Sequence, residues 1–227
     1  MKTTLTDSVI SLQRPASGRR RRLPWKKFLA LSEEKQTTIR NAALACFAKH
    51  GYEKASINDI ASAAGISKAS MFQYFGNKQA LYEYLFQYCV TQMRHAYRLD
   101  ILDDHTDFFD RVWAASVMKV ENLKKHPYVA AFITSAATEN ASDLKDALGS
   151  AITEGRQFTE VLVLHEEDRI KFKHSEDAAL VFQMLLLLGD GMVSRCENGI
   201  DYDGIMSELD SILKMLKRNF YKEEYLQ

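Results

Sequence analysis

The sequence predicts an all-α protein, with a short group of helices near the N-terminus followed by a longer series of helices. Glycine and proline are sparse, at 10 and 3 of 227 residues, which disfavours a loop-rich β fold. Apolar residues recur at spacings of three and four, and no segment alternates as a strand does. A chain of this length fits one or two domains and buries a sizeable core.

The first expected helix runs from Glu33 to His50. Ser32 is a suitable N-cap, and the two glutamates that follow it place negative charge in the first turn, where the helix dipole favours it. Gly51 is the expected C-terminal stop. The buried stripe should consist of Ile39, Ala42, Ala43, Cys46 and Phe47. We interpret this helix as a scaffold for the two that follow.

The second expected helix begins at Ser56 and ends before Gly65. Ser56 and Asp59 fit a capping box in which Asp replaces the usual Glu or Gln. Gly65 should adopt a positive φ, which glycine reaches without steric cost. One apolar stripe lies between these ends and consists of Ile57, Ile60, Ala61 and Ala64.

The third expected helix is short, begins after the cap residue Ser67 and ends at Gly76 and Asn77. Lys78 follows, at a place where its ammonium can meet a phosphate. Side chains expected to face the core are those of Met71, Phe75 and Ala69. Side chains expected to face outward are those of Lys68, Ser70, Gln73 and Tyr74.

The stretch from Ser56 to Lys78 therefore predicts a helix-turn-helix that presents its second helix to the major groove of DNA. The turn has the length of about three to four residues that this motif requires. An ordinary helical hairpin would explain the apolar stripe alone. It would not explain the two caps, the glycine turn and the outer face of hydroxyl, amide and aromatic groups together.

Residues from about Thr38 to Phe86 resemble the DNA-binding domain of the tetracycline-repressor (TetR/AcrR) family of transcriptional regulators. The remainder of the chain is consistent with that family in length and helical character. The residues that carry the resemblance are Ala42, Phe47, Gly51, Tyr52, Ala55, Ser56, Ile57, Ile60, Ala61, Ala64, Gly65, Ile66, Ser67, Lys68, Tyr74, Phe75, Lys78 and Leu81.

Two positions of the third helix depart from the family pattern. Phe72 stands where a tyrosine is common, so a phenol contact to DNA is lost. Gln73 stands where the family often has an aromatic residue or a histidine, and its amide can hydrogen-bond adenine in the major groove. We therefore expect a different sequence preference from that of better-known relatives.

The resemblance implies a homodimeric repressor that binds a palindromic operator in double-stranded DNA and is released by a small-molecule effector. It also implies a three-helix helix-turn-helix domain followed by a helical ligand-binding and dimerisation domain. We expect base edges to be faced by Lys68, Ser70 and Gln73, and the phosphate backbone to be contacted by Ser56, Ser67, Tyr74 and Lys78. Ala69 and Phe72 complete the set of expected DNA-binding residues. Activation in place of repression remains open.

We expect three parts: a basic, flexible N-terminal arm over residues 1–30, the helix-turn-helix domain over 31–80, and the effector-binding and dimerisation domain over 81–227. The chain has no net charge, but residues 1–30 carry +7, residues 31–85 carry +1 and residues 86–227 carry −8. Basic charge thus lies on and before the helix-turn-helix. The run Arg19 to Arg22 either contacts DNA phosphates or the minor groove, or is a solvated tail without a specific role.

A long helix from Asn77 to about Arg98 should connect the helix-turn-helix to the rest of the chain. Further helices are expected over residues 106–125, 127–138, 141–166, 175–198 and 202–221. The last two, taken from each of two subunits, would form a four-helix dimer interface, and an intramolecular core is the alternative. Their apolar residues are Ala178, Leu180, Phe182, Leu185, Leu186 and Leu188, and Ile205, Leu209, Ile212, Leu213, Met215 and Leu216.

An effector cavity is expected among the middle helices, but the sequence assigns no ligand-binding residue. An apolar or amphipathic small molecule would suit such a cavity. Every candidate is equally well explained as ordinary core or surface. The candidates are Phe108, Phe109, Trp113, Met118, Phe132, Phe158, Phe182 and Met192, with the polar residues Asn122, His126, Thr134, Gln157 and Gln183.

The sequence contains no glycine-rich phosphate loop, no H-E-x-x-H and no G-x-S-x-G. We interpret the run from His165 to Asp168 as a solvated helix end, because adjacent helical residues point in different directions. We expect no catalytic residue, no metal site and no cofactor. The alternatives are a DNA-binding regulator or architectural protein without an effector, and a helical enzyme or metal-binding protein.

The cysteines Cys46, Cys89 and Cys196 lack metal-ligand spacing, which favours a reduced, cytoplasmic protein. We expect the first two to be buried apolar residues. No signal peptide is recognised. The longest apolar run, over residues 178–188, is interrupted by Gln183 and is too short to span a membrane. We therefore expect no membrane association.

Overall fold

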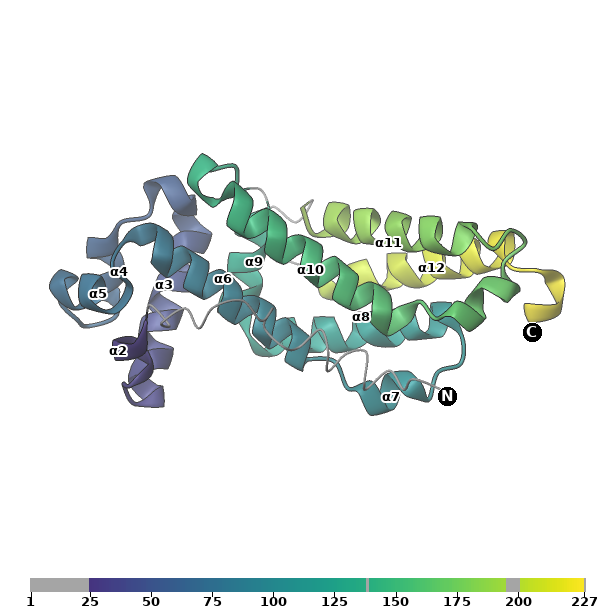
Figure 1. Ribbon diagram of the computed structural model, residues 1–227, viewed down its shortest axis with the longest axis horizontal. Coiled ribbons are helices and arrows are strands. Elements are labelled where there is room, and N and C mark those ends of the chain that lie inside the picture. Colours follow the sequence, from purple (N-terminus) through teal and green to yellow (C-terminus); the bar gives the residue numbers. More distant parts are fainter. Residues whose placement is uncertain (1–24, 138, 195–200, 227) are drawn as a thin grey trace. The chain divides into compact units, whose positions relative to one another are not determined.

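The computed structural model describes residues 25–137, 139–194 and 201–226, and these are built from helices (Figure 1). Within them, extended pairing is limited to an isolated bridge between Phe172 and Tyr221, which confirms the all-α prediction. The α-helices are α2 (Lys26–Leu29), α3 (Glu33–Lys54), α4 (Ile57–Ala63), α5 (Lys68–Phe75), α6 (Lys78–His95), α7 (Leu99–Asp103), α8 (Phe108–Lys125), α9 (Pro127–Ala137), α10 (Lys145–Val163), α11 (Asp177–Ser194) and α12 (Tyr202–Phe220). Short 3-10 helices are η1 (Ser142–Leu144), η2 (Glu166–Lys171) and η3 (Glu223–Tyr225).

The chain divides into two compact units. The described residues of the N-terminal unit lie within Ala16–Gln92 and Leu123–Ile152. Those of the C-terminal unit lie within Met93–Asn122 and Thr153–Gln227. None of the described helices is both long enough and apolar enough to cross a lipid bilayer.

The N-terminal unit is built around the packing of α3 against α9. Phe47 of α3 lies 5.0 Å from Tyr82 of α6 and 6.4 Å from Phe132 of α9, measured between ring centroids. The backbone N–H of Tyr52 donates to the Glu139 carboxylate at 2.8 Å, which fastens the end of α3 to the residues after α9. One hydrophobic cluster thus joins residues on both sides of the expected boundary at residue 80. Independent folding of residues 31–80 remains a proposal.

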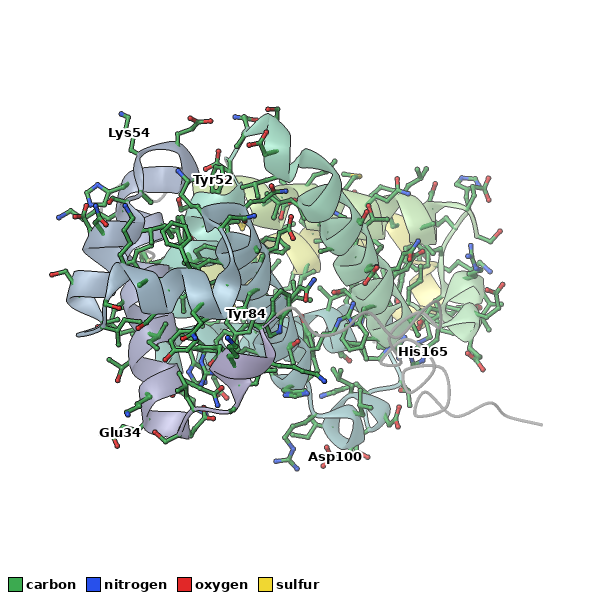
Figure 2. The ribbon with its side chains drawn as sticks, turned by 60° about the vertical axis from the view of Figure 1, so that its left-hand side comes forward. Glu34, Tyr52, Lys54, Tyr84, Asp100 and His165 are labelled. Carbon is green, nitrogen blue, oxygen red and sulfur yellow. The ribbon has the colours of Figure 1, made fainter. Side chains whose placement is uncertain are left out.

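Helix α2 lies within the segment that we expected to be a flexible arm. The Phe28 side chain is fully buried, with its ring centroid 4.8 Å from that of Phe75 and 5.1 Å from that of Tyr84. Figure 2 shows Tyr84 in the interior of this unit, beside α2. The expectation of flexibility is therefore wrong for residues 25–30. The arginine run from Arg19 to Arg22 lies outside the described residues.

The helix ends follow local sequence signals with small differences. The Ser32 hydroxyl caps α3 by accepting from the backbone N–H of Lys35 at 3.4 Å. Gly51 breaks the helical geometry of α3 with a φ of 68°, as expected of its stop, and a last helical turn continues to Lys54. The expected connector is shorter than predicted, because α6 ends at His95 and the separate helix α7 follows.

The C-terminal unit contains α7, α8, the second half of α10, η2, α11 and α12 around its own core. The earlier candidates for an effector cavity are divided between the units, since Phe132 belongs to the N-terminal core and Phe158 to the C-terminal one. Most of these phenylalanines are plain core residues, with at most 4% of each side chain exposed.

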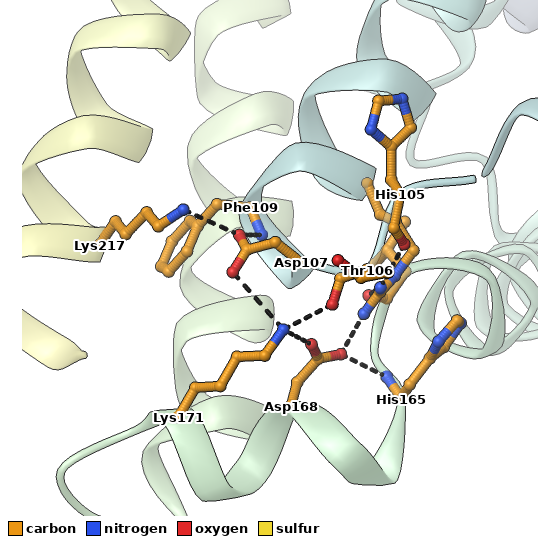
Figure 3. A network of polar contacts seen from close by, with 10 residues as sticks. His105, Thr106, Asp107, Phe109, His165, Asp168, Lys171 and Lys217 are labelled. Carbon is orange, nitrogen blue, oxygen red and sulfur yellow. Dashed lines mark hydrogen bonds and ion pairs between the residues drawn. The ribbon is translucent and has the colours of Figure 1, made fainter. Parts of the chain in front are cut away.

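A buried ion pair joins α8 to η2 in the C-terminal unit (Figure 3). The Arg111 guanidinium donates to the Asp168 carboxylate, to the carbonyl of Val163 at 3.1 Å and to that of His105 at 2.8 Å. Asp168 also accepts from the backbone N–H of His165 at 3.0 Å and from the Lys171 ammonium at 3.1 Å. Only 1% of Asp168 is exposed, so the interpretation of this run as a solvated helix end is wrong.

The Asp168→Ala variant should destabilise the protein strongly, because it leaves the Arg111 guanidinium buried without a carboxylate. We expect a loss of about 3–5 kcal/mol in the free energy of unfolding, measured by urea denaturation followed by circular dichroism. Asp100→Ala is the matched control, because its carboxylate pairs with Arg98 at 2.6 Å on the exposed surface. That variant should leave the urea midpoint almost unchanged. Equal shifts in the two variants would contradict a special role for the buried pair.

Candidate nucleic-acid interface

Helices α4 and α5 form the predicted pair, and α4 ends in a Schellman motif. The backbone N–H of Ile66 donates to the carbonyl of Ala61 at 3.0 Å, and that of Gly65 donates to the carbonyl of Ser62 at 3.1 Å. Gly65 has a φ of 67°, as the sequence predicts. These two bonds satisfy the last carbonyls of α4 and turn the chain directly into α5.

Serine side chains cap both helices of the pair. The Ser56 hydroxyl accepts from the backbone N–H of Asn58 at 3.2 Å, one residue earlier than a capping box with Asp59 requires. The Ser67 hydroxyl accepts from the backbone N–H of Ser70 at 3.1 Å and lies 2.9 Å from the Ser70 hydroxyl. Both predicted caps are therefore present, and Ser67 and Ser70 form one pair of hydroxyls at the start of α5.

Helix α5 buries one face and exposes the other. Met71 and Phe75, one helical turn apart, are 1% and 5% exposed. Ala69 is exposed, so its expected position in the core is wrong, and this places it on the outer face. The exposed residues of α5 are Lys68, Ala69, Phe72 and Gln73, and its half-buried ones are Ser70 and Tyr74.

Phe72 and Lys68 lie next to each other on this outer face. The Phe72 side chain is 43% exposed, and the Lys68 ammonium lies 5.9 Å from the centre of its ring. Since the two residues are one turn apart, the contact holds an apolar ring and a cation together on an exposed helix. This surface can offer both a charge to a phosphate or guanine and an apolar edge to a thymine methyl group.

The inner face of α5 rests on an aromatic cluster that sequence reasoning missed. The Phe75 ring lies 4.8 Å from Phe28 of α2 and 5.4 Å from Tyr84 of α6, between centroids. Trp25 packs edge-on against Tyr84 at 5.2 Å. The aromatic pair at Trp25 and Phe28 was the available signal, but it follows a basic run and forms no periodic pattern.

Lys78 has protein partners at the position where we expected a phosphate contact. Its ammonium donates to the carbonyls of Tyr52 at 2.9 Å, Glu53 at 3.0 Å and Ala55 at 3.5 Å. It also lies 4.6 Å from the centre of the Tyr52 ring. An ammonium has three donors, so Lys78 caps the end of α3 and positions α6. A contact to phosphate remains a prediction that this geometry does not favour.

The cysteines of the N-terminal unit are not activated thiols. Burial raises the pKa of Cys89 to about 12, and its side chain is fully buried. Burial also raises the pKa of Cys46. Because a reactive cysteine needs a lowered pKa and access, both fit the predicted role of small apolar residues.

Comparison with known proteins supports the interface that this geometry outlines. Residues 39–85 match the family model described as bacterial regulatory proteins, tetR family. The chain is a tetR-family protein. The match spans α4 and α5, together with most of α3 and the first half of α6.

Curated tetR-family relatives are similar over the same short segment. The putative mycofactocin biosynthesis transcriptional regulator MftR of Mycobacterium tuberculosis is 42% identical over 43 residues, which are 19% of this chain and 22% of MftR. The repressor AcnR of Corynebacterium efficiens is 41% identical over 44 residues, or 19% of this chain and 23% of AcnR. The matched segment therefore spans less than a quarter of each relative.

A solved tetR-like structure extends the similarity in fold to most of the chain. The transcriptional regulator FadR of Bacillus subtilis, solved in complex with stearoyl-CoA, superposes with a TM-score of 0.65. The superposition covers 78% of this chain and 96% of FadR, at 16% sequence identity. At this identity the similarity concerns the fold alone.

The Gly65→Ala variant should lower the stability of this tetR-family protein by about 1–2 kcal/mol, the cost of a left-handed backbone for a residue with a Cβ. A Cβ at position 65 would meet no atom within 4 Å, so the loss reports backbone strain alone. Gly155→Ala, within α10, is the matched control, since its Cβ also meets no atom within 4 Å. It should stabilise the protein by up to about 1 kcal/mol. Urea denaturation of both variants measures the difference, and a neutral Gly65→Ala would refute the strained turn.

Proposed function

We propose that this chain is a DNA-binding transcription regulator that acts in the cytoplasm as a homodimer. It binds a palindromic operator, represses transcription there and leaves the operator when a small molecule binds. The observation that carries the proposal is the outer face of α5, where Lys68, Phe72 and Gln73 are exposed on a helix held by a Schellman turn. The match to the tetR family model over this segment supports it. We propose no enzymatic activity.

Each exposed side chain of α5 has a defined part in the proposal. Gln73 reads adenine through its amide, and Lys68 binds guanine or a nearby phosphate. Phe72 packs against a thymine methyl group, which replaces the phenol contact common in the family. The hydroxyls of Ser67 and Ser70 and the half-buried Tyr74 fix the helix on the phosphate backbone. Ser56 and Ala69 lie close enough in sequence to this face to contact the duplex backbone.

A duplex from the gene's own promoter region, followed by fluorescence anisotropy at several salt concentrations, tests this reading head. Gln73→Ala should weaken binding by about 1–3 kcal/mol and relax the preference at one base pair. Lys68→Ala should weaken binding and, if the lysine meets a phosphate, flatten the salt dependence by about one unit of slope. Lys125→Ala, an exposed lysine at the end of α8, is the control for lost charge.

Failure to select any sequence from a random duplex library would overturn the DNA-binding proposal. Selective binding that no small molecule alters would instead favour a regulator or architectural protein without an effector.

The homodimer rests on an exposed apolar stripe of α11. Leu180, Met184, Leu187 and Leu188 repeat with helical spacing and are 55%, 43%, 65% and 39% exposed. Helix α12 runs alongside α11 and adds Met215, which is 44% exposed (Figure 1). Gly189 and Gly191 leave open space, since a Cβ at either would meet no atom within 4 Å. A stripe of this size marks a contact with another surface, and an isologous pair of α11–α12 hairpins fits it.

The structure sorts the apolar residues that we expected in this interface. Leu180, Leu188 and Met215 remain available to a partner, and Met184 and Leu187 join them. The others face the core of their own unit and are not interface candidates, as is clearest for Ala178, Phe182, Leu185, Leu213 and Leu216. The proposed interface is thus narrower than the sequence predicts.

The Leu187→Glu variant should convert the dimer to a monomer, because it places a charge in the centre of an apolar contact. Sedimentation velocity at micromolar concentration measures the change. Ile170→Glu is the matched control, because Ile170 is exposed to nearly the same degree, 61% against 65%, but lies on η2 away from the stripe. A dimer that survives Leu187→Glu would refute this interface, and a monomeric parent protein would refute the homodimer.

A further inference from the structure

Helix α8 carries a charged residue in the middle of its buried face. Phe108, Val112, Ala115 and Leu123 follow one another at spacings that place them on one side of the helix, and none is more than 8% exposed. Lys119 lies on the same row, between Ala115 and Leu123, yet its side chain is exposed to solvent. A core-facing position that solvent can reach means that the apolar packing of the C-terminal unit opens at Lys119.

The charges around Lys119 do not balance. Asp190 of α11 interacts electrostatically with the Lys119 ammonium and also accepts from the Arg156 guanidinium of α10, at 2.9 Å. Two cations from two helices therefore share one carboxylate from a third. Among the described residues, the Lys119 ammonium forms no hydrogen bond or close ion pair. Desolvation lowers the pKa of Lys119, which shows that the surrounding protein disfavours its charge.

The protein treats its other buried cation differently. Arg111, on the same helix, has a carboxylate and two carbonyls as partners and is fully enclosed. Lys119 combines access to solvent, apolar neighbours and an excess of positive charge. An anion with an apolar body supplies the missing charge and fills the apolar space together.

Arg94, near the end of α6, adds a second incompletely paired cation to the C-terminal unit. Its buried Nε has no hydrogen-bond partner among the described atoms, and its guanidinium lies 5.3 Å from the Phe158 ring centre. The neighbouring Met93 contacts Asn122, which is less than one turn from Lys119 on α8. Donors from α6 and α8 are therefore connected through one contact.

We propose that Lys119 and Arg156 bind the acid group of an amphipathic organic anion, in competition with Asp190. This inference names the chemical class of the effector and so rests on the proposed function for its regulatory meaning. The ion pair between Arg156 and Asp190 lies at the exposed side of the site, with 49% and 65% of the two side chains accessible. The incoming acid group replaces Asp190 as the partner of Arg156, while the apolar body lies along the buried face of α8.

Binding to the full-length protein without DNA tests the site itself. The probes are laurate, its neutral counterpart dodecanol, and the fluorescent aromatic sulfonate 1-anilinonaphthalene-8-sulfonate. Lys119→Gln should weaken the binding of laurate and of the sulfonate about tenfold, the loss expected for one hydrogen bond to a charged group. Dodecanol should bind the parent protein and this variant equally. Asp190→Asn should strengthen anion binding several-fold, because it removes the competing carboxylate.

Lys125→Gln removes the same charge from the end of the same helix and should leave all affinities unchanged. A thermal melt of each variant separates lost binding from lost folding, and Asp190→Asn provides a gain that unfolding cannot imitate. Anion affinity that is the same in the parent, Lys119→Gln and Asp190→Asn proteins overturns the proposal, as does the absence of binding by both anions. Charge-dependent binding that leaves DNA affinity unchanged supports the anion site and refutes the ligand-released repressor instead.

Discussion

The packing of Phe75 against Phe28 and Tyr84 is the contact on which the reading face depends. A helix of eight residues such as α5 is not stable by itself in water, so its position comes from what it buries. Three aromatic rings from α2, α5 and α6 meet with centroids about 5 Å apart. Because they fix the inner face of α5, they also decide which side chains its outer face presents.

Two cations on α8 illustrate how the same kind of residue serves structure and function. Arg111 is enclosed and fully paired, so it stabilises the connection between α8 and η2 without being available to a ligand. Lys119, two turns further along, is accessible and shares its carboxylate with Arg156. Burial alone does not distinguish a structural charge from a binding one. The presence or absence of a complete set of partners does.

Local signals made the core of the candidate site predictable. Gly65 and Ser67 have preferences that act within a few residues, and the turn and the cap lie where the sequence places them. Contacts between distant residues were not predictable in this way. Nothing near Phe28 announces that it packs against Phe75, and nothing near Lys78 announces the carbonyls of Tyr52 and Glu53. Asp168 was misjudged for the same reason, since its partner Arg111 is 57 residues away.

The three carbonyls capped by Lys78 make α6 and the start of the reading pair one mechanical body. Lys78 is the first residue of α6, and Ala55, the last of its acceptors, directly precedes the cap residue of α4. A tilt of α6 therefore pulls on the peptide groups that set the direction in which α4 leaves α3. A tilt of only a few degrees need not disturb the turn at Gly65 in order to re-aim α5, because the whole pair pivots from its first residue.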